Sequence, residues 1–205
     1  MSLRSQNSEV PSQVPVVLPH KRPQLTSALV DMVAAQYNIP SEFCLSLQNA
    51  LGNASTPITF VVIDIENYPN IEHDSRFKIV MKDETSKFVV TASYSQALLN
   101  KLDCKDRAVF CDHTVRNEQD AADTHLIMLA QTMFMLSNLT RRTQDKFVVF
   151  SNDHVFKNMA WVMDSNFHTW ADDGNAPPPT ARVRLCSGLA KRADANAPPL
   201  QPRQS

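Results

Sequence analysis

Three short apolar runs, each leading into polar or acidic residues, limit most strongly what this chain can fold into. They are Phe60–Ile63 (FVVI), Ala108–Cys111 (AVFC) and Phe147–Phe150 (FVVF), and stretches with helical periodicity lie between them. Continuous apolar runs of this length are typical of strands that are covered on both faces. Strands that alternate with helices favour a mainly parallel sheet with helices on both sides. We therefore expect an α/β protein with a three-layer α/β/α sandwich.

The residues between and beside these runs predict the remaining elements. Helices are expected from Thr26 or Ser27 to about Tyr37, over 41–52 with Gly52 at the end, over 93–102, from a cap at Asn117 to about Ser137, and over 154–163. Strands are expected over 59–64, 77–81, 108–112 and 146–150, with a further possible strand over 181–186. The run 87–91 fits either a hairpin partner of 77–81 or a lead into a helix.

Composition divides the chain into three parts. Residues 1–23 are expected to form a flexible N-terminal arm, residues 24–173 the α/β domain, and residues 174–205 a Pro-rich, mildly basic C-terminal tail. From Arg182 onward five Lys and Arg residues face one Asp, which gives 5 − 1 = +4. Two interpretations of this excess remain open, namely solubility and a flexible arm that holds phosphates.

Several function classes are excluded or disfavoured by composition. A net charge of −1 argues against a general polycation, so nucleic-acid binding requires local patches. The three glycines cannot build a P-loop or a dinucleotide-binding turn. The four cysteines contain no CxxC pair, which favours reduced thiols over a zinc cluster or a disulfide frame. Neither an 18-residue apolar run nor a signal peptide is evident, so we expect a cytoplasmic protein outside the membrane.

Acidic residues recur where the predicted strands end. Asp64 follows FVVI, Asp112 follows AVFC, and Asp153 follows FVVF after two polar residues. An Asp after a strand is often only a turn former or a helix cap. Strands of a parallel sheet, however, place all their carboxyl ends at one edge, which is where such sheets bind ligands. The three carboxylates are therefore expected at one edge of the sheet.

A further pair of acids begins the predicted helix after Asn117. Asp120, Asp123, Ile127, Ala130 and Phe134 follow helical spacing, so we expect them on one core-facing stripe. The helix dipole explains Asp120 but not an acid aligned with the core, since a buried unpaired carboxylate costs several kcal/mol. A divalent cation would resolve the repulsion among these acids. Oxygen ligands favour Mg²⁺ or Mn²⁺ and disfavour zinc.

Three stretches resemble the PIN-like nuclease superfamily, nearest to its NYN branch. They are VVIDIENYPN, NEQDAADTHLIMLAQ and FVVFSNDHVF, and the resemblance covers roughly residues 58–165. It implies a metal-dependent ribonuclease fold. The implied catalytic and metal-binding acids are Asp64, Asp123 and Asp153, with Asp120 as an accessory, Asn67 beside the first acid, and Ser151 and Asn152 shaping the last turn.

The chain departs from this family pattern at one position. The family often carries a second Asp before the Phe that follows the last acid, whereas this chain has His154-Val155-Phe156. Asp112 is the candidate substitute. Glu66 lies one step past the strand end and receives little weight.

Basic residues near the predicted site are candidates for contact with RNA phosphates. They are Arg116 and the pair Arg141 and Arg142. For the pair, a favourable charge near the end of the preceding helix is an equally open interpretation.

The sequence therefore supports a metal-dependent endoribonuclease acting on single-stranded or structured RNA. The alternative is a degenerate PIN-like module that binds RNA or protein, with its tails serving a homo-oligomer or a protein partner. A phosphatase-like enzyme with an Asp nucleophile fits less well, because Ile65-Glu66 follows Asp64 where such enzymes carry D-x-D.

Overall fold

The central strands are buried on both faces, as their continuous apolar runs require. In the computed structural model all six residues of β1 (Ile58–Ile63) are buried. Phe60 and Val62 contribute to one core, and Val61 and Ile63 to the core on the opposite face. The structure describes residues 27–37, 39–53, 56–100, 102, 108–112, 116–118, 120–170 and 180–188.

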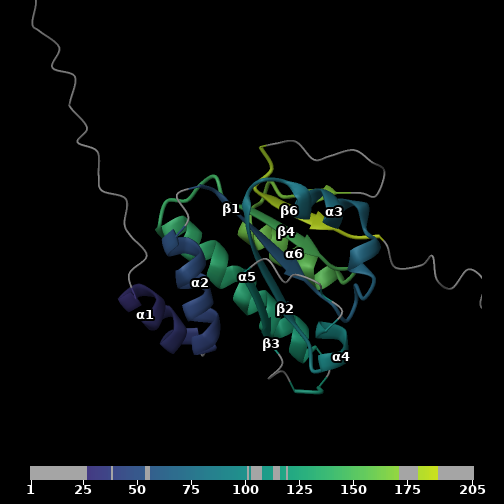
Figure 1. Ribbon diagram of the computed structural model, residues 1–205, viewed down its shortest axis with the longest axis horizontal. Coiled ribbons are helices and arrows are strands. Elements are labelled where there is room, and N and C mark those ends of the chain that lie inside the picture. Colours follow the sequence, from purple (N-terminus) through teal and green to yellow (C-terminus); the bar gives the residue numbers. More distant parts are fainter. Residues whose placement is uncertain are drawn as a thin grey trace, which may run out of the picture.

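A six-stranded parallel sheet forms the middle layer (Figure 1). Besides β1, its strands are β2 (Ser86–Ala92), β3 (Ala108–Asp112), β4 (Lys146–Phe150), β5 (His168–Trp170) and β6 (Val183–Cys186). Their spatial order is β3-β2-β1-β4-β6-β5. The chain moves outward from β1 to β3 and then crosses back to place β4 on the other side of β1. The strand order therefore reverses between β1 and β4, where sheets of this type bind ligands.

Helices cover both faces of the sheet, which confirms the three-layer α/β/α architecture. One face carries α1 (Ser27–Tyr37), α2 (Ser41–Asn53), α5 (Ala121–Leu139) and α6 (His154–Met163). The other carries the 3₁₀ turn η1 (Ile71–His73), α3 (Ser75–Lys82) and α4 (Gln96–Leu99). The expected helices over 27–37 and 154–163 and the strands over 108–112 and 146–150 are confirmed at these bounds.

The predicted strand over 77–81 was wrong, because this stretch belongs to α3. Asp74 caps the helix, since its side chain accepts a hydrogen bond from the Arg76 backbone N–H at 2.7 Å. Arg76 and Val80, four residues apart, form the buried side of the helix. The alternation of FKIVM fits a strand as well as a short amphipathic helix, and the cap decides between them.

Other boundaries also differ from the prediction. Residues 86–92 pair with β1 in parallel, so they form neither a hairpin nor a lead into a helix. Only Gln96–Leu99 of the expected helix over 93–102 is helical, and α2 extends one residue past Gly52. The long helix α5 begins after Asp120 rather than at a cap on Asn117. The short β5 was not predicted, and β6 inserts between it and β4.

The buried side of α5 matches the stripe that the sequence indicated only in part. Ala130 of that stripe is buried, whereas Ile127 and Phe134 are only partly buried. The larger buried side chains that pack in the main core are Leu126, Leu129, Met133 and Leu136. The helix is apolar on more than one side, so its periodicity did not fix its orientation.

The edge of the sheet from which the strands start is held by a cluster of polar side chains. Asp145 is buried and accepts hydrogen bonds from the Ile58 backbone N–H, the Ser137 hydroxyl and Arg142 Nε, each at 2.9 Å. Arg182 donates to the Ser137 hydroxyl at 2.9 Å and lies 4.7 Å from the centre of the Phe134 ring. Arg182 therefore belongs to the fold, so neither solubility nor a flexible phosphate-holding arm, the two interpretations left open for the basic tail, accounts for this residue.

Arg141 ends α5 in a left-handed conformation with φ of 56°. Two bonds close this end, from the Arg141 N–H to the Asn138 carbonyl at 2.9 Å and from the Arg142 N–H to the Ser137 carbonyl at 2.8 Å. This is the Schellman pattern, which normally carries glycine at the left-handed residue. Arg141→Gly is therefore expected to raise the free energy of unfolding by about 0.5–1 kcal/mol in urea denaturation.

A matched glycine substitution two residues earlier tests this interpretation. Leu139 is 47% exposed and lies inside α5, so Leu139→Gly is expected to destabilise the protein by about 1 kcal/mol. Loss of stability in both variants would contradict the assignment of the strain to Arg141.

Cys44 and Cys186 are buried free thiols, and Cys104 lies outside the described residues. None of the helices in the described ranges combines the length and the apolar character that a membrane crossing requires.

Candidate functional site

Asp64 is a buried carboxylate at the point where the strand order reverses. It directly follows β1, is 2% exposed, and its backbone N–H donates to the Phe150 carbonyl of β4 at 3.0 Å. Its Oδ2 accepts from the Ser151 hydroxyl at 2.5 Å, and its Oδ1 accepts from the Asn67 backbone N–H at 3.1 Å. Burial raises the pKa of Asp64, the two hydrogen bonds partly offset this, and the nearby Asp153 raises it further.

Ser151 connects Asp64 to Asp153. The Ser151 hydroxyl donates to Asp64 and accepts from the Asp153 backbone N–H at 2.9 Å. Asp153 caps α6, since its Oδ1 accepts from the Val155 N–H at 2.9 Å. His154, the next residue, is exposed, with Nδ1 3.1 Å from Asp153 Oδ1. The first and third predicted acids thus share one hydroxyl.

Asn67 and Asn152 fix the loops on which these acids lie. The Asn152 amide donates to the Asn67 carbonyl at 2.9 Å and accepts from the Gly188 backbone N–H at 2.9 Å. The ends of β1, β4 and β6 are thereby joined by one side chain. Asn67 and Asn152 thus lie beside Asp64 and Asp153 and contact the backbone of these loops.

Asp123, in the first turn of α5, is the most perturbed acid of this edge. Burial raises its pKa to about 6, with further contributions from the negative charges of Asp64, Asp153, Asp120 and Glu66. These four acids therefore lie close enough to Asp123 to repel its charge. The structure brings Asp64, Asp123 and Asp153 to one edge of the sheet, as the sequence analysis expects.

Asp120 precedes α5 with a left-handed backbone, φ 59° and ψ 8°. Its carbonyl accepts from the Thr124 N–H at 3.0 Å and from the Thr124 hydroxyl at 2.8 Å. Asp is one of the few residue types that adopt this conformation readily. The sharp turn directs the start of α5 toward the acids of β1 and β4.

Glu66 is a site residue to which the sequence analysis gave too little weight. Its Oε1 accepts from the Ser93 hydroxyl at 2.7 Å, which ties it to the end of β2. It is also one of the charges that raise the pKa of Asp123. The sequence indicates this role through the position of Glu66 two residues after Asp64, because in an extended chain such residues point to the same side.

Asp112 is held by a histidine. It is 2% exposed and lies at the end of β3, with its Oδ2 3.0 Å from His125 Nδ1 on α5. Two strand spacings, about 10 Å, separate the ends of β1 and β3. The proposed substitution of Asp112 for a missing acid therefore lacks support from its position, and His125 is a contact that the sequence analysis did not anticipate.

The three candidate arginines do not lie together. Arg116 is exposed and lies in the connection that leads to the start of α5, with Nη1 3.7 Å from Glu118 Oε1. Arg141 and Arg142 lie at the other end of this 19-residue helix, about 28 Å away along its axis. Arg142 also donates to the Thr56 carbonyl at 2.9 Å. The pair is thus not brought to the acidic edge.

The donor set at this edge consists of carboxylate, hydroxyl and amide oxygens, which suits a hard divalent cation. Among the described residues, no group of three or more His, Cys, Asp or Glu side chains is arranged to hold a metal ion. Mg²⁺ commonly binds through one or two carboxylates and keeps several waters, without a preformed protein cage. The oxygen donors and the raised carboxyl pKa values therefore fit such an ion.

Comparisons of this chain with family models, with curated proteins and with solved structures give no match. The resemblance to PIN-like nucleases thus rests on the three sequence motifs, and the role of the acids stays a prediction.

Proposed function

We propose that this protein is a Mg²⁺- or Mn²⁺-dependent ribonuclease that hydrolyses RNA phosphodiester bonds at the edge formed by Asp64, Asp123 and Asp153. The observation that carries the proposal is the convergence of these acids where the strand order reverses, with the pKa of Asp123 raised to about 6. Unpaired carboxylates cost stability when they are brought together. Clusters of acids with raised pKa values, which reduce the stability of the fold, are typical of functional sites.

The acids have distinct roles in this proposal. Asp64, oriented by Ser151 and by the Asn67 backbone, is the buried ligand. Asp153 is held at the start of α6 and Asp123 at the start of α5, so both face the substrate side. The cation, when bound, supplies Lewis-acid stabilisation of the phosphate and a more acidic water. Asp123 would complete the set of carboxylates that holds the cation, and the repulsion that raises its pKa in the metal-free protein would be relieved by the positive charge.

The direct test is cleavage of a labelled single-stranded RNA in Mn²⁺ or Mg²⁺ by the wild type and by Asp64→Asn and Asp153→Asn. Cleavage by the wild type is expected, while both variants and a chelator-treated sample fall to the rate without protein. Asp31→Asn, an exposed acid on α1, is the matched control and is expected to cleave like the wild type. Equal background in all samples would reject the nuclease.

The same protein variants also test the alternative, a module that binds RNA without cleaving it. The stretch His154-Val155-Phe156, which lacks the second Asp that PIN-like nucleases often carry before the Phe, favours this alternative. A module of this kind shifts RNA in an electrophoretic assay without cleaving it, and Asp64→Asn leaves the shift unchanged. Arg116→Ala is then expected to weaken the shift more than Arg141→Ala, because only Arg116 lies near the acidic edge.

A further inference from the structure

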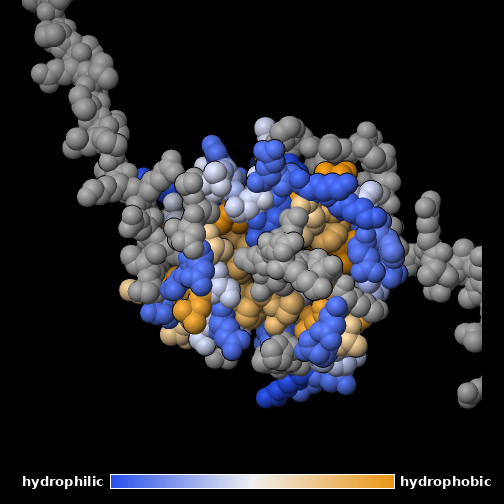
Figure 2. Space-filling model, viewed as in Figure 1, coloured by the Kyte–Doolittle hydropathy of each residue, from blue (hydrophilic) through white to orange (hydrophobic). Residues whose placement is uncertain are grey.

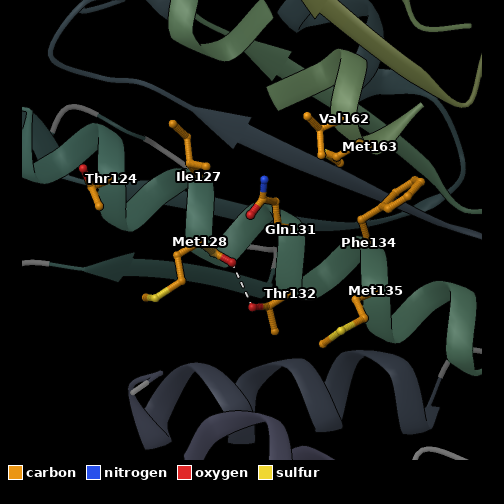
Figure 3. A pocket seen from close by; sticks show the side chains of 9 residues that line it. All are labelled: Thr124, Ile127, Met128, Gln131, Thr132, Phe134, Met135, Val162 and Met163. Atoms are coloured by element: carbon orange, nitrogen blue, oxygen red, sulfur yellow. Dashed lines mark hydrogen bonds between the residues drawn. The ribbon is translucent and has the colours of Figure 1, made fainter. Parts of the chain in front are cut away.

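An apolar groove runs over the outer surface of α5. Its volume is about 490 Å³, within the roughly 300–1,000 Å³ of pockets that hold ligands. Ile127, Met128, Phe134 and Met135 line it from α5, and Val162 and Met163 line it from α6 (Figure 3). One end of it is lined by Thr124, next to Asp123, but none of the acids proposed to act in cleavage lines it.

The composition of α5 indicates that this groove is covered by something. From Thr124 to Thr140 the chain contains no Asp, Glu, Lys or Arg, although one side of the helix faces outward. Helices that are apolar all round are normally buried on all sides. Val162 on the opposite wall is 63% exposed. Apolar surface of this kind marks interaction sites.

Other apolar side chains are exposed on helices of the same face. Met32 of α1 is 59% exposed and Leu45 of α2 is 60% exposed. Figure 2 shows an orange patch in the area of α1 and α2, whereas the area of α3 is mostly blue. In Figure 3, Met128 and Met135 point from α5 toward the purple-blue helices of the α1–α2 region. The groove therefore lies on the face of the sheet that also carries α1, where the chain enters the described fold.

We propose that residues 10–19 of this chain, VPSQVPVVLP, dock in this groove. The chain enters the described fold at Ser27, the first residue of α1. From Leu18 to Ser27 nine residues span up to about 30 Å when extended, whereas the 11 residues of α1 are about 16 Å long. The segment can thus run back past the length of α1 and reach α5.

The segment matches the groove in charge and in shape. It has no charged residue, and neither has the groove lining, while Glu9 and His20-Lys21-Arg22 flank the segment. Three prolines restrict its backbone before docking, which lowers the entropy lost on binding. Extended Pro-rich segments are commonly bound in grooves that contain aromatic residues, a part that Phe134 takes here.

Attachment to the same chain makes the segment a better occupant than a free partner. A linked segment has an effective concentration in the millimolar range, so even a weak contact is populated. Gln131, an exposed amide in the lining, provides a hydrogen-bonding group for an extended backbone. The apolar side chains Val14, Val16, Val17 and Leu18 supply the contact area.

The test compares methyl NMR spectra of methionine-labelled full-length protein. Val17→Glu/Leu18→Glu is expected to shift the methyl signals of Met128, Met135 and Met163, because it places charge in the docked segment. Ser5→Glu/Ser8→Glu adds the same charge outside the segment and is the matched control, with these signals unchanged. Neither pair of changes touches the described fold, so loss of folding does not confuse the result.

A peptide covering residues 9–20 provides the second measurement. It is expected to bind the Val17→Glu/Leu18→Glu protein at least tenfold more tightly than the wild type, whose own segment competes. The proposal would be overturned if the methionine methyl signals of the groove were the same in the wild type and in Val17→Glu/Leu18→Glu. Equal affinity of the peptide for both proteins would also overturn it. Signals that change with protein concentration alone would instead assign the groove to a second copy of the chain.

Discussion

Asp123→Asn is expected to raise the free energy of unfolding of the metal-free protein at pH 7 by on the order of 2 kcal/mol while abolishing RNA cleavage. The pKa of Asp123 is raised from its ordinary value of 3.8 to about 6, first by burial and then by the surrounding acids. Each pKa unit corresponds to about 1.4 kcal/mol, and partial access to solvent reduces the total. The neutral amide removes the repulsion together with one of the carboxylates proposed to hold the cation.

The pH dependence identifies the cause of this stabilisation. Because the folded protein holds the Asp123 proton more tightly than the unfolded chain does, stability falls as pH rises from about 4 to 6. Asp123→Asn removes this part of the decline, so the two proteins are expected to differ little at pH 4 and most at pH 7. Urea denaturation at several pH values measures the difference.

Two additional measurements separate repulsion from a general effect of the substitution. Asp31→Asn, on the exposed side of α1, is expected to change stability by less than 0.5 kcal/mol at every pH. Millimolar Mg²⁺ is expected to stabilise the wild type more than Asp123→Asn, since only the wild type offers the third carboxylate. A variant that is less stable than the wild type at pH 7 would contradict the electrostatic assignment.

The sheet could be predicted from the sequence because its central strands carry continuous apolar runs. Those of β1 and β4 are buried on both faces, which leaves little choice of structure. The stretch around Val80 was mistaken for a strand because five residues are too few to separate a period of 2 from one of 3.6. The Asp74 cap is local, but the burial of Arg76 depends on carbonyl partners distant in sequence, at Trp170 and Ser187.

The acidic edge was predicted for a topological reason. Parallel strands place Asp64 and the residues after β4 at one edge whatever the details of the loops. A position at the end of a strand does not, however, indicate how far apart two such residues lie across the sheet. Asp112 therefore lies two strands away beside His125, while Glu66, given little weight, contributes to the raised pKa of Asp123.

Arg76→Met is expected to lower the free energy of unfolding by about 3–5 kcal/mol, because it leaves Asp74 as a buried charge without its partner. Arg76 is 2% exposed and Asp74 is fully buried, with Arg76 Nη2 2.8 Å from Asp74 Oδ2. Tyr68 donates its hydroxyl hydrogen to the same Oδ2 at 2.6 Å. Burial opposes ionisation of Asp74, but hydrogen bonds from Arg76 and Tyr68 outweigh it and hold the pKa below its usual value.

A matched set of variants isolates the ion pair. Lys78→Met removes a positive charge from the exposed side of the same helix and is expected to change stability by less than 0.5 kcal/mol. Asp74→Asn/Arg76→Met removes both charges and is expected to recover part of the loss. Equal stability of Arg76→Met and Lys78→Met in urea denaturation would show that the pair contributes nothing.

The effect of Arg76→Met should extend to the acidic edge through a chain of hydrogen bonds. Arg76 donates to the Ser187 carbonyl at 2.9 Å, and the next residue, Gly188, donates its N–H to Asn152. Asn152 holds the Asn67 carbonyl, and the Asn67 N–H holds Asp64. We therefore expect faster amide exchange at Asn67 and Gly188 in Arg76→Met than in Lys78→Met, even in conditions where both proteins remain folded. Unchanged exchange at both positions would mean that the buried ion pair stabilises the fold without positioning the first acid of the site.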